Sequence, residues 1–409
     1  MAVSLLAHEI SDLCLAKPAL RSLAVTATVA DASSALRSSD EAFISVWDCN
    51  HSPGSVTGAD GHECRCIGKV SMVDVTCYLC KDENLLSPCA AMKAPVSHIL
   101  SKIPGLIMHL EPSSSLLDAI DLILQGAQNL IAPIQRRLST NSRKKQQHPK
   151  AGGCAASTTT IHGGGREFCW LTQEDVVRFL LSSIGLFSPV PAISIDALGI
   201  ISSDVLTTDY HAPAISALDL ISRSLADQTS VAVVDCDGVL IGEISPLTVA
   251  CCDEAAAAAI ATLSSGDLMA YIDGGGPPED LVRVVKLRLK ERNLEGMLET
   301  FTAISSGNRT TSSFSSSSSC SSDEDSSLSP TTTLPRSSGR YGRSASYSAR
   351  MVRRAEAIVC HRKSSLVAVM IQAIAHRVNY VWVIEDDCSL IGIVTFSGIL
   401  KVFREYTMA

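Results

Sequence analysis

Two similar stretches of the sequence decide the fold: Val231-Ala-Val-Val-Asp-Cys-Asp-Gly-Val-Leu-Ile-Gly-Glu-Ile-Ser245 and Val381-Trp-Val-Ile-Glu-Asp-Asp-Cys-Ser-Leu-Ile-Gly-Ile-Val-Thr395. In each stretch, two apolar runs flank a tight acidic turn, which is typical of a β-hairpin. In the first stretch, Asp237-Gly238 supplies the positive φ that such a turn needs. A unit of this size cannot bury its own hydrophobic face, so the repeats must pack against one another.

Two further copies appear when insertions within the hairpin are allowed. Residues 43–48 resume at 66–71 after a loop containing Gly, His and Cys, and residues 130–134 resume at 168–172 after a long basic loop. A helix with apolar residues three or four apart precedes each hairpin, and a short extended stretch precedes each helix. These stretches are Arg21–Val25, Leu106–Leu110, Ile200–Leu206 and Glu356–Cys360. The order strand, helix, strand, strand, helix therefore occurs four times.

That order, with a Gly-hydrophobic-hydrophobic-Ser/Thr-x-x-Asp motif closing the third strand, resembles the cystathionine β-synthase (CBS) domain. The opening residues 10–14 and the final Leu390-Ile-Gly-Ile-Val-Thr395 are also similar to this domain. With four copies, no attached catalytic domain and a Ser-rich insertion, the chain resembles plant CBS-domain-only proteins of the CBSX group. The resemblance implies an α/β fold (α+β type) in which four units pair into two Bateman-type modules. Each module would have a central cleft between facing sheets and outer helices.

Pairing adjacent repeats predicts two modules joined at Ser188-Pro-Val-Pro191, because Pro-rich segments stiffen a linker. The predicted units are repeat 1 at 1–80, repeat 2 at 95–185 with a basic loop at 135–167, repeat 3 at 195–265, and repeat 4 at 350–409. Residues 277–304 read as a basic amphipathic helix, either on the module surface or as a partner-binding helix of the calmodulin-target kind. Residues 305–348 are poor in apolar groups and are predicted to be disordered.

Composition narrows the function class. The chain has 409 residues, 46% hydrophobic and 19% charged, with a net charge of −8 and a pI near 5.7. The acidic balance argues against nucleic-acid binding by the whole chain. No apolar run approaches the length that spans a bilayer, so no membrane association is expected. Glu9 and Asp12 leave no room for a leader, and the 15 cysteines form no regular framework, so a cytoplasmic protein with reduced thiols is expected.

The candidate ligand-binding residues are Ser71, Asp74, Thr172 and Asp175, which form Ser/Thr-x-x-Asp motifs after the third strand of repeats 1 and 2. A carboxylate at the mouth of a cleft can accept both hydroxyls of a ribose. In the CBS family these positions line the cleft that binds adenosyl ligands. The same spacing is also a capping-box variant that satisfies backbone N–H groups at a helix start, and one residue can do both jobs.

Repeats 3 and 4 have Thr248 and Gly398 in place of the acid. Without that carboxylate, ribose recognition loses charge-assisted hydrogen bonds, each worth roughly 1.5–3 kcal/mol. The second module is therefore the poorer candidate. No cofactor is expected, and the candidate effectors are an adenosine nucleotide or S-adenosylmethionine. The residues between each Ser or Thr and its Asp include neither Arg nor His, so a ligand with few phosphate groups is favoured.

The sequence gives less support for a metal site, a redox site or an enzyme active site. Cys49, His51, His62, Cys64 and Cys66 cluster around the first hairpin loop, but their spacing matches no zinc finger, and no metal site is predicted. The Cys77-x-x-Cys80 pair lies inside a predicted helix, where a redox motif does not belong. No nucleophile elbow, phosphate loop or metalloprotease helix occurs, so an enzyme is not expected. Arg136-Arg-Leu-Ser139 resembles a basophilic kinase site, which makes Ser139 a candidate phosphorylation site.

The sequence therefore predicts a non-enzymatic regulatory protein that senses an adenosyl ligand or regulates a partner through CBS pairs. The alternative is a ligand-free scaffold that uses the CBS pairs only for assembly. The resemblance implies a homodimer through helix faces and an unidentified regulated protein.

Overall fold

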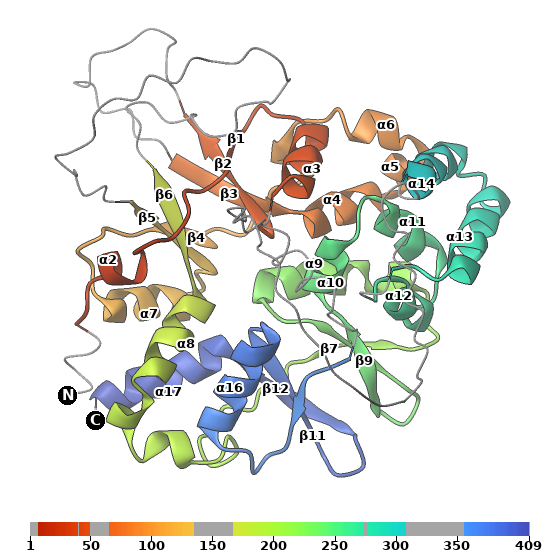
Figure 1. Cartoon of the computed structure of the whole chain (residues 1–409). Helices are drawn as coiled ribbons and strands as arrows, with labels where there is room; N and C mark the ends of the chain where they lie inside the picture. The colour runs from red at the N-terminus through yellow and green to blue at the C-terminus, as the bar shows by residue number, and fades with distance from the viewer. Residues whose placement is uncertain are drawn as a thin grey trace, which may run out of the picture.

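The computed structural model describes residues 7–39, 41–49, 65–134, 167–273, 276–307 and 356–408. These residues form four three-stranded sheets (Figure 1). In every sheet the first strand runs parallel to the second, and the second runs antiparallel to the third. The predicted fold class, with four strand-helix-strand-strand-helix units paired into two modules, is confirmed.

The bounds of the elements follow the predicted order. Repeat 1 contains β1 (Ser22–Ala24), α3 (Val29–Arg37), β2 (Phe43–Asp48), β3 (Arg65–Ser71) and α4 (Met72–Leu79). Repeat 2 contains β4 (Ile107–His109), α7 (Leu116–Leu124), β5 (Asn129–Pro133), β6 (Phe168–Thr172) and α8 (Gln173–Ser182). Repeat 3 contains β7 (Leu206–Asp209), α9 (Leu218–Asp227), β8 (Val231–Val234), β9 (Leu240–Ile244) and α10 (Pro246–Cys251). Repeat 4 contains β10 (Val359–Cys360), α16 (Leu366–His376), β11 (Tyr380–Ile384), β12 (Leu390–Thr395) and α17 (Phe396–Met408).

In repeats 1, 2 and 3, the segment that leads into the repeat lies along the third strand of the paired repeat, and we call it the crossing segment. The N-terminal segment, which includes α2 (Ile10–Leu13), packs on repeat 2, where the Leu20 N–H donates to the Phe168 carbonyl at 2.8 Å (Figure 1). The extended stretch predicted at Ile200–Leu206 meets the first strand of repeat 3, β7, only at Leu206, because Ser202 forms a bridge with Ile393 of repeat 4 instead. The contiguous boundaries drawn from the sequence therefore do not coincide with the packing units.

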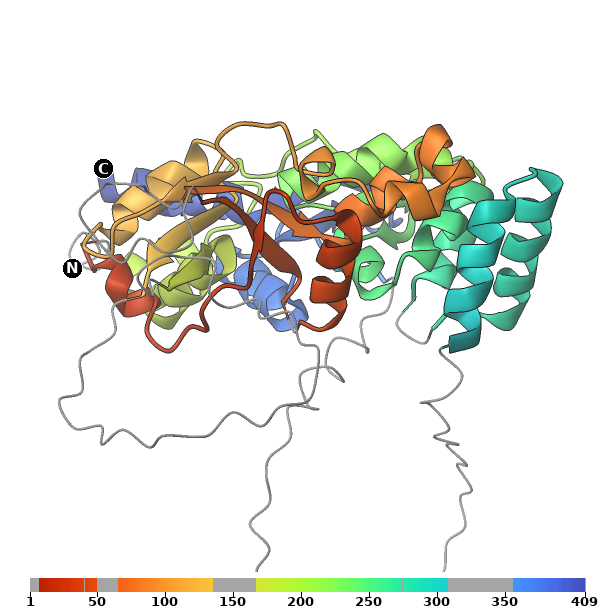
Figure 2. The same ribbon diagram turned by 90° about the horizontal axis from the view of Figure 1, so that it is seen from above.

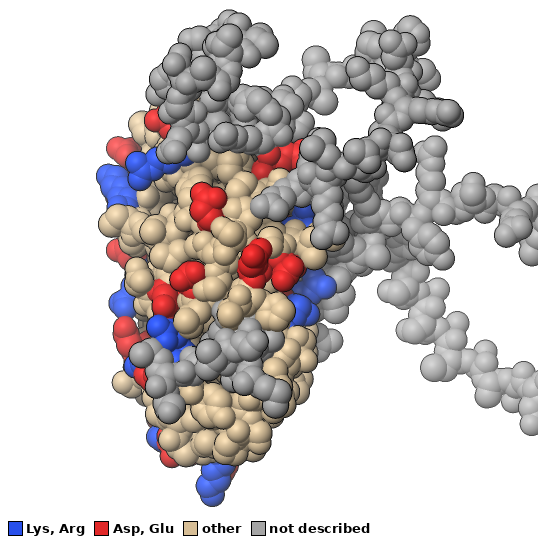
Figure 3. Space-filling view, turned by 90° about the vertical axis from the view of Figure 1, so that its left-hand side faces the viewer, with Lys and Arg blue, Asp and Glu red and all other residues tan. Residues whose placement is uncertain are grey.

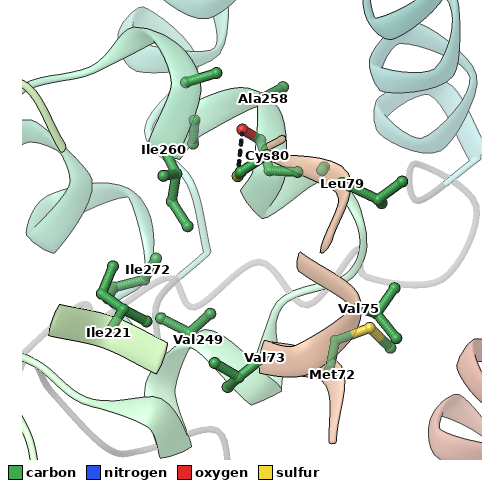
Figure 4. Packing of buried hydrophobic residues seen from close by; sticks show 14 of the residues in the cluster. Met72, Val73, Val75, Leu79, Cys80, Ile221, Val249, Ala258, Ile260 and Ile272 are labelled. Atoms are coloured by element: carbon green, nitrogen blue, oxygen red, sulfur yellow. Dashed lines mark hydrogen bonds between the residues drawn. The ribbon is translucent and has the colours of Figure 1, made fainter. Parts of the chain in front are cut away.

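Sheets join the repeats within each module, and helices join the two modules. One large core cluster combines repeats 1 and 3, and another combines repeats 2 and 4. Figure 4 shows α4 of repeat 1 facing Ile221, Val249 and Ile260, with the Cys80 thiol donating to the Ala257 carbonyl at 3.5 Å. Helix faces of one module are thus covered by helices of the other module of the same chain.

One arginine–carboxylate pair bonds across each helix interface. Arg37 on α3 pairs with the buried Glu254 at 2.7 Å, and Ser33 donates to the same carboxylate. Arg404 on α17 pairs with Asp121 on α7 through two hydrogen bonds of 2.6 and 3.2 Å. The Arg404 pair is bidentate, which adds geometric specificity to the contact between α17 and α7.

Repeat 3 is followed by a helical extension, which lies at one end of the molecule (Figure 2). It contains α11 (Ala255–Thr262), α12 (Ser265–Tyr271), α13 (Glu279–Glu291) and α14 (Glu295–Gly307), so the single helix predicted at 277–304 is two helices. Val285 and Leu289 of α13 are fully buried, and the Arg288 guanidinium donates to the Thr262 carbonyl at the end of α11 at 2.6 Å. The apolar face is thus used within the chain, which supports the surface-helix interpretation over a calmodulin-type target.

Some predictions fall on other parts of the chain. Ser139 and most of the basic loop lie outside the described residues, as does the Ser-rich insertion beyond residue 307. Residues 305–307, predicted to be disordered, are the last turn of α14. None of the helices in the described ranges is both long and apolar enough to cross a bilayer.

Gly392 in β12 provides a test of the contact between this strand and the crossing segment at Ser202. A Cβ atom at this position would lie 2.4 Å from the Ser202 carbonyl oxygen, which is backbone and cannot rotate away. We expect Gly392→Ala to destabilise the fold by about 1–3 kcal/mol, the usual cost of overpacking. Gly185→Ala is the matched control, because no atom lies within 4 Å of its added Cβ. Thermal unfolding of both variants measures the difference, and equal midpoints would contradict the crossing contact.

Candidate functional site

A cavity of about 1160 Å³ opens beside the third strand of repeat 1. Its walls come from β3 and α4 with Lys81 after it, from residues 98–109, which lead into and include β4, from Gln128, and from α9 of repeat 3. The cavity is therefore shared by both modules. Its volume exceeds the roughly 300–1,000 Å³ of common small-molecule sites and is sufficient for a nucleotide.

Asp74 lines this cavity and also caps α4. Its Oδ2 accepts hydrogen bonds from the Ser71 backbone N–H and the Ser71 hydroxyl, both at 2.7 Å, which completes a capping box. Its other oxygen, Oδ1, makes no hydrogen bond among the described residues. Capping and ligand binding are thus compatible at this carboxylate, because each function can use a different oxygen.

The environment of Asp74 shifts its ionisation. Burial raises the pKa of Asp74 to about 6, against which the hydrogen bonds from Ser71 and the charge of Lys69 act more weakly. Burial likewise lowers the pKa of Lys69 to about 7. The Lys69 ammonium donates to the Asn129 side-chain carbonyl of repeat 2 and lies 4.3 Å from the centre of the Phe43 ring. A partly desolvated carboxylate and ammonium side by side are typical of a binding site.

The raised pKa predicts that Asp74→Asn stabilises the ligand-free protein at pH 7. The folded-state pKa of Asp74 lies above its ordinary value of 3.8, so folding favours the protonated acid. That stabilising contribution is full below pH 3.8 and is lost as pH rises through about 6. The substitution should therefore raise the unfolding free energy by up to about 3 kcal/mol at pH 7 and by progressively less as pH falls from 6 to 4. Thermal unfolding across this pH range measures the difference, and a pH-independent difference would contradict the assignment.

The second predicted pair, Thr172 and Asp175, has a different environment. Thr172 and Asp175 form the capping box of α8, but Asp175 Oδ2 also accepts a hydrogen bond from Lys17, whose ammonium donates to the Trp170 carbonyl at 2.9 Å. Asp175 does not line the cavity. The Ser/Thr-x-x-Asp motif is the same in repeats 1 and 2. The two acids differ in their surroundings, because the crossing segment places Lys17 against Asp175.

The sequence motif did not predict the basic residues that line the cavity. Five Lys or Arg side chains line it against three Asp: Arg65, Lys69, Lys81, Lys102 and Arg223 against Asp74, Asp219 and Asp227. Arg65, Lys69 and Lys81 lie within ten residues of Ser71 or Asp74, whereas Lys102 and Arg223 are brought to the cavity only by the folded chain. The Gly68-Lys69 position within the repeat motif was the one available signal. The expectation of a low phosphate count rested on the motif alone, and this lining favours a phosphate-bearing ligand.

In the second module, a smaller cavity of about 350 Å³ lies between Ile391 of β12 and the segment at residues 196–203. Glu243, which occupies the repeat position of Lys69, is 2% exposed and accepts hydrogen bonds from the Tyr380 hydroxyl at 2.9 Å and the Trp382 indole N–H at 2.7 Å. Two large aromatic rings from repeat 4 thus fill the interface with repeat 3. Thr248 in the acid position donates to the Ser245 carbonyl at 2.8 Å and is buried.

Within the described ranges, no group of three or more His, Cys, Asp and Glu side chains is placed to hold a metal ion. His51, His62 and Cys64 lie outside those ranges. Burial raises the pKa of Cys77 to about 12 and also raises that of Cys80, so neither thiol is activated. This agrees with the interpretation of Cys77-x-x-Cys80 as part of a packed helix.

Comparison with known proteins gives two relatives from Arabidopsis thaliana. The CBS domain-containing protein CBSX5 is 50% identical over 414 residues, which cover 99% of this chain and 99% of CBSX5. The CBS domain-containing protein CBSX6 is 30% identical over 437 residues, which cover 100% of this chain and 96% of CBSX6. No family model matches the chain.

Among solved structures, protein MJ1225 of Methanocaldococcus jannaschii, described as an archaeal homologue of g-AMPK, has a similar fold. It aligns with a TM-score of 0.51 over 97% of this chain and 100% of its own, at 13% sequence identity. The identity is low enough that this likeness concerns the fold alone. The identity to CBSX5 and CBSX6 over nearly the full length, together with four sheets of one topology, shows that the chain belongs to the plant CBSX family of CBS-domain proteins.

Proposed function

We propose that this protein is a non-enzymatic regulator whose first module binds an adenosyl ligand with phosphate groups in the cavity beside Asp74. The observation that supports this most directly is a cavity-lining carboxylate with one oxygen used for capping and the other without a partner among the described residues. Asp74 Oδ1 would accept the ribose hydroxyls, and the lysine and arginine side chains of the lining would bind the phosphates.

The regulatory effect follows from the walls of the cavity. Both modules contribute to it, since α9 of repeat 3 supplies Asp219 and Arg223. A ligand bound there would contact both modules and favour one arrangement of them. A ligand shifts a conformational equilibrium only by its differential affinity for the two states, so the partner protein must prefer one arrangement.

The second module favours the other candidate function, a scaffold. Its interface is filled by the Glu243, Tyr380 and Trp382 cluster and has no acid in the ribose position. We therefore assign ligand binding to the first module and a supporting role to the second. The face seen in Figure 3 has acidic and basic side chains interspersed on a largely uncharged surface, which suits a protein partner better than nucleic acid.

Calorimetric titration of the full chain with AMP, ADP, ATP and S-adenosylmethionine tests the proposal. We expect at least one nucleotide to bind and S-adenosylmethionine to bind more weakly, because it carries no phosphate. At 100 times its dissociation constant, the ligand should raise the unfolding free energy by about 2.7 kcal/mol. Absence of binding by all four compounds would favour the ligand-free scaffold.

A further inference from the structure

The N-terminal crossing segment holds a lysine against the acid of repeat 2. The Lys17 ammonium donates to Asp175 Oδ2 and, at 2.9 Å, to the Trp170 carbonyl oxygen. The side chains of this ion pair are largely covered, with 21% of Lys17 and 28% of Asp175 exposed. Water screens such a pair less than it screens a pair on the open surface, so the attraction between the two charges is stronger.

Three positions of repeat 2 correspond to positions of repeat 1 that line the cavity. Counted from the capping residues, the pairs are Trp170 with Lys69, Asp175 with Asp74, and Phe179 with Tyr78. In repeat 2, all three positions contact the N-terminal segment. Lys17 bonds to Trp170 and Asp175, and the centre of the His8 ring lies 5.7 Å from that of Phe179 in an edge-on arrangement. The N-terminal segment therefore covers in repeat 2 the face that lines the cavity in repeat 1.

The crossing segment that leads into repeat 2 carries an isoleucine at the place of Lys17. Residues 17–20 (Lys-Pro-Ala-Leu) and residues 103–106 (Ile-Pro-Gly-Leu) share a proline and a leucine at the same spacing. Ile103 lines the cavity and is 53% exposed. Because Ile103 has no charge, it leaves the carboxylate of Asp74 available to a ligand. The two crossing segments thus differ in the side chain that they present to the acid of the motif.

Backbone contacts on both sides of Lys17 keep it in place. The Ile10 N–H donates to the Ser114 carbonyl at 2.9 Å, and the Leu20 N–H donates to the Phe168 carbonyl at 2.8 Å. The segment is therefore ordered by folding, and the ion pair costs little further conformational entropy. A free ligand would have to displace a cation that the chain itself supplies at a high effective concentration.

We propose that Lys17 is a specificity-determining residue that closes a second adenosyl-ligand position at Asp175, so that the protein binds one ligand per chain and not two. The ammonium occupies the carboxylate that would otherwise accept the ribose hydroxyls. In repeat 1, by contrast, Lys69 donates to Asn129, and Asp74 faces the cavity. The ligand class in this inference rests on the proposed function.

Calorimetric titration of the full chain with AMP, ADP, ATP and S-adenosylmethionine tests the closure. Lys17→Ala removes the ammonium, so we expect the number of ligands bound per chain to double. Lys17→Arg is the matched control, because a guanidinium keeps the charge and can still bond to Asp175, and it should bind as many ligands as the parent. In Lys17→Ala combined with Asp74→Asn, tight binding should remain at one position and should be lost when Asp175→Asn is added.

Each outcome of these titrations decides between closure and its absence. Unchanged stoichiometry in Lys17→Ala, or loss of all binding when Asp74→Asn is added to it, would overturn the inference. If the parent binds none of the four compounds while the variant with both substitutions binds one, the proposed function at Asp74 fails and the closure stands. If neither binds, both fail. Thermal unfolding verifies that each variant is folded, and Lys17→Met, which keeps the apolar stem without the charge, replaces Lys17→Ala if the latter does not fold.

Discussion

Replacing Asp74 by Asn is expected to weaken nucleotide binding to this protein by at least about 100-fold, because two charge-assisted hydrogen bonds to the ribose, each worth roughly 1.5–3 kcal/mol, would become neutral or be lost. The amide keeps an oxygen that can accept the capping bonds from Ser71, so α4 should remain folded. Calorimetric titration of the variant with the nucleotide that binds the parent most tightly measures the effect.

Asp175→Asn is the matched control for this experiment. It changes the same atom in the same motif of the paired repeat, but Asp175 is bonded to Lys17 and lies away from the cavity. We expect its nucleotide affinity to stay within about threefold of the parent, since surface and half-buried ion pairs contribute little at a distance. Equal losses in both variants would show that the motif acts through helix capping, and the ribose assignment would be abandoned.

Replacing Trp382 by Ala should destabilise the second module more than any other single change discussed above. The side chain is fully buried, so its loss costs about 3–5 kcal/mol through transfer and cavity formation. Glu243 would also lose one of its two aromatic hydrogen-bond donors. The loss of a hydrogen bond to this buried carboxylate should lower the free energy of unfolding by about 1–3 kcal/mol more. We expect the midpoint of thermal unfolding of this module to fall by roughly 10 °C or more.

The hydrogen bond and the packing can be separated with phenylalanine. Trp382→Phe keeps a large ring but removes the N–H donor to Glu243, so it should cost about 1–3 kcal/mol. Trp170→Phe makes the same change at an indole N–H that is buried without a partner among the described residues, and should cost less. Calorimetry that resolves the two modules compares the variants, and a larger loss for Trp170→Phe would contradict the role given to Glu243.

Short-range patterns in the sequence were sufficient to predict the four repeats. The apolar runs on both sides of the turn at Asp237-Gly238 predict a hairpin, and Gly238 has a φ of +79°. Ser71 and Thr172 form the capping boxes that their spacing predicts, and the structure shows two more at Thr28 and Ser115. These features depend on neighbours within a few residues, which is why one chain without an alignment could reveal them.

The site was predicted only in part. The motif placed Asp74 and Asp175 on equal terms, but the cavity includes only Asp74. The basic residues of its lining come from β3, from Lys81 after α4, from the crossing segment and from α9, and no short sequence window contains all of them. The exchange of crossing segments was missed for the same reason, since a contact such as Ser202 with Ile393 joins residues far apart in the chain.

By itself, the sequence determined the repeated unit, its number and its family, because hydrophobic periodicity and turn residues act over short distances along the chain. Only the tertiary structure decided which repeats pack helix against helix, and which acid lines the cavity while the other pairs with Lys17. Those outcomes depend on how surfaces from distant segments fit together, and the pairing energy of two such surfaces is not a property of either segment alone.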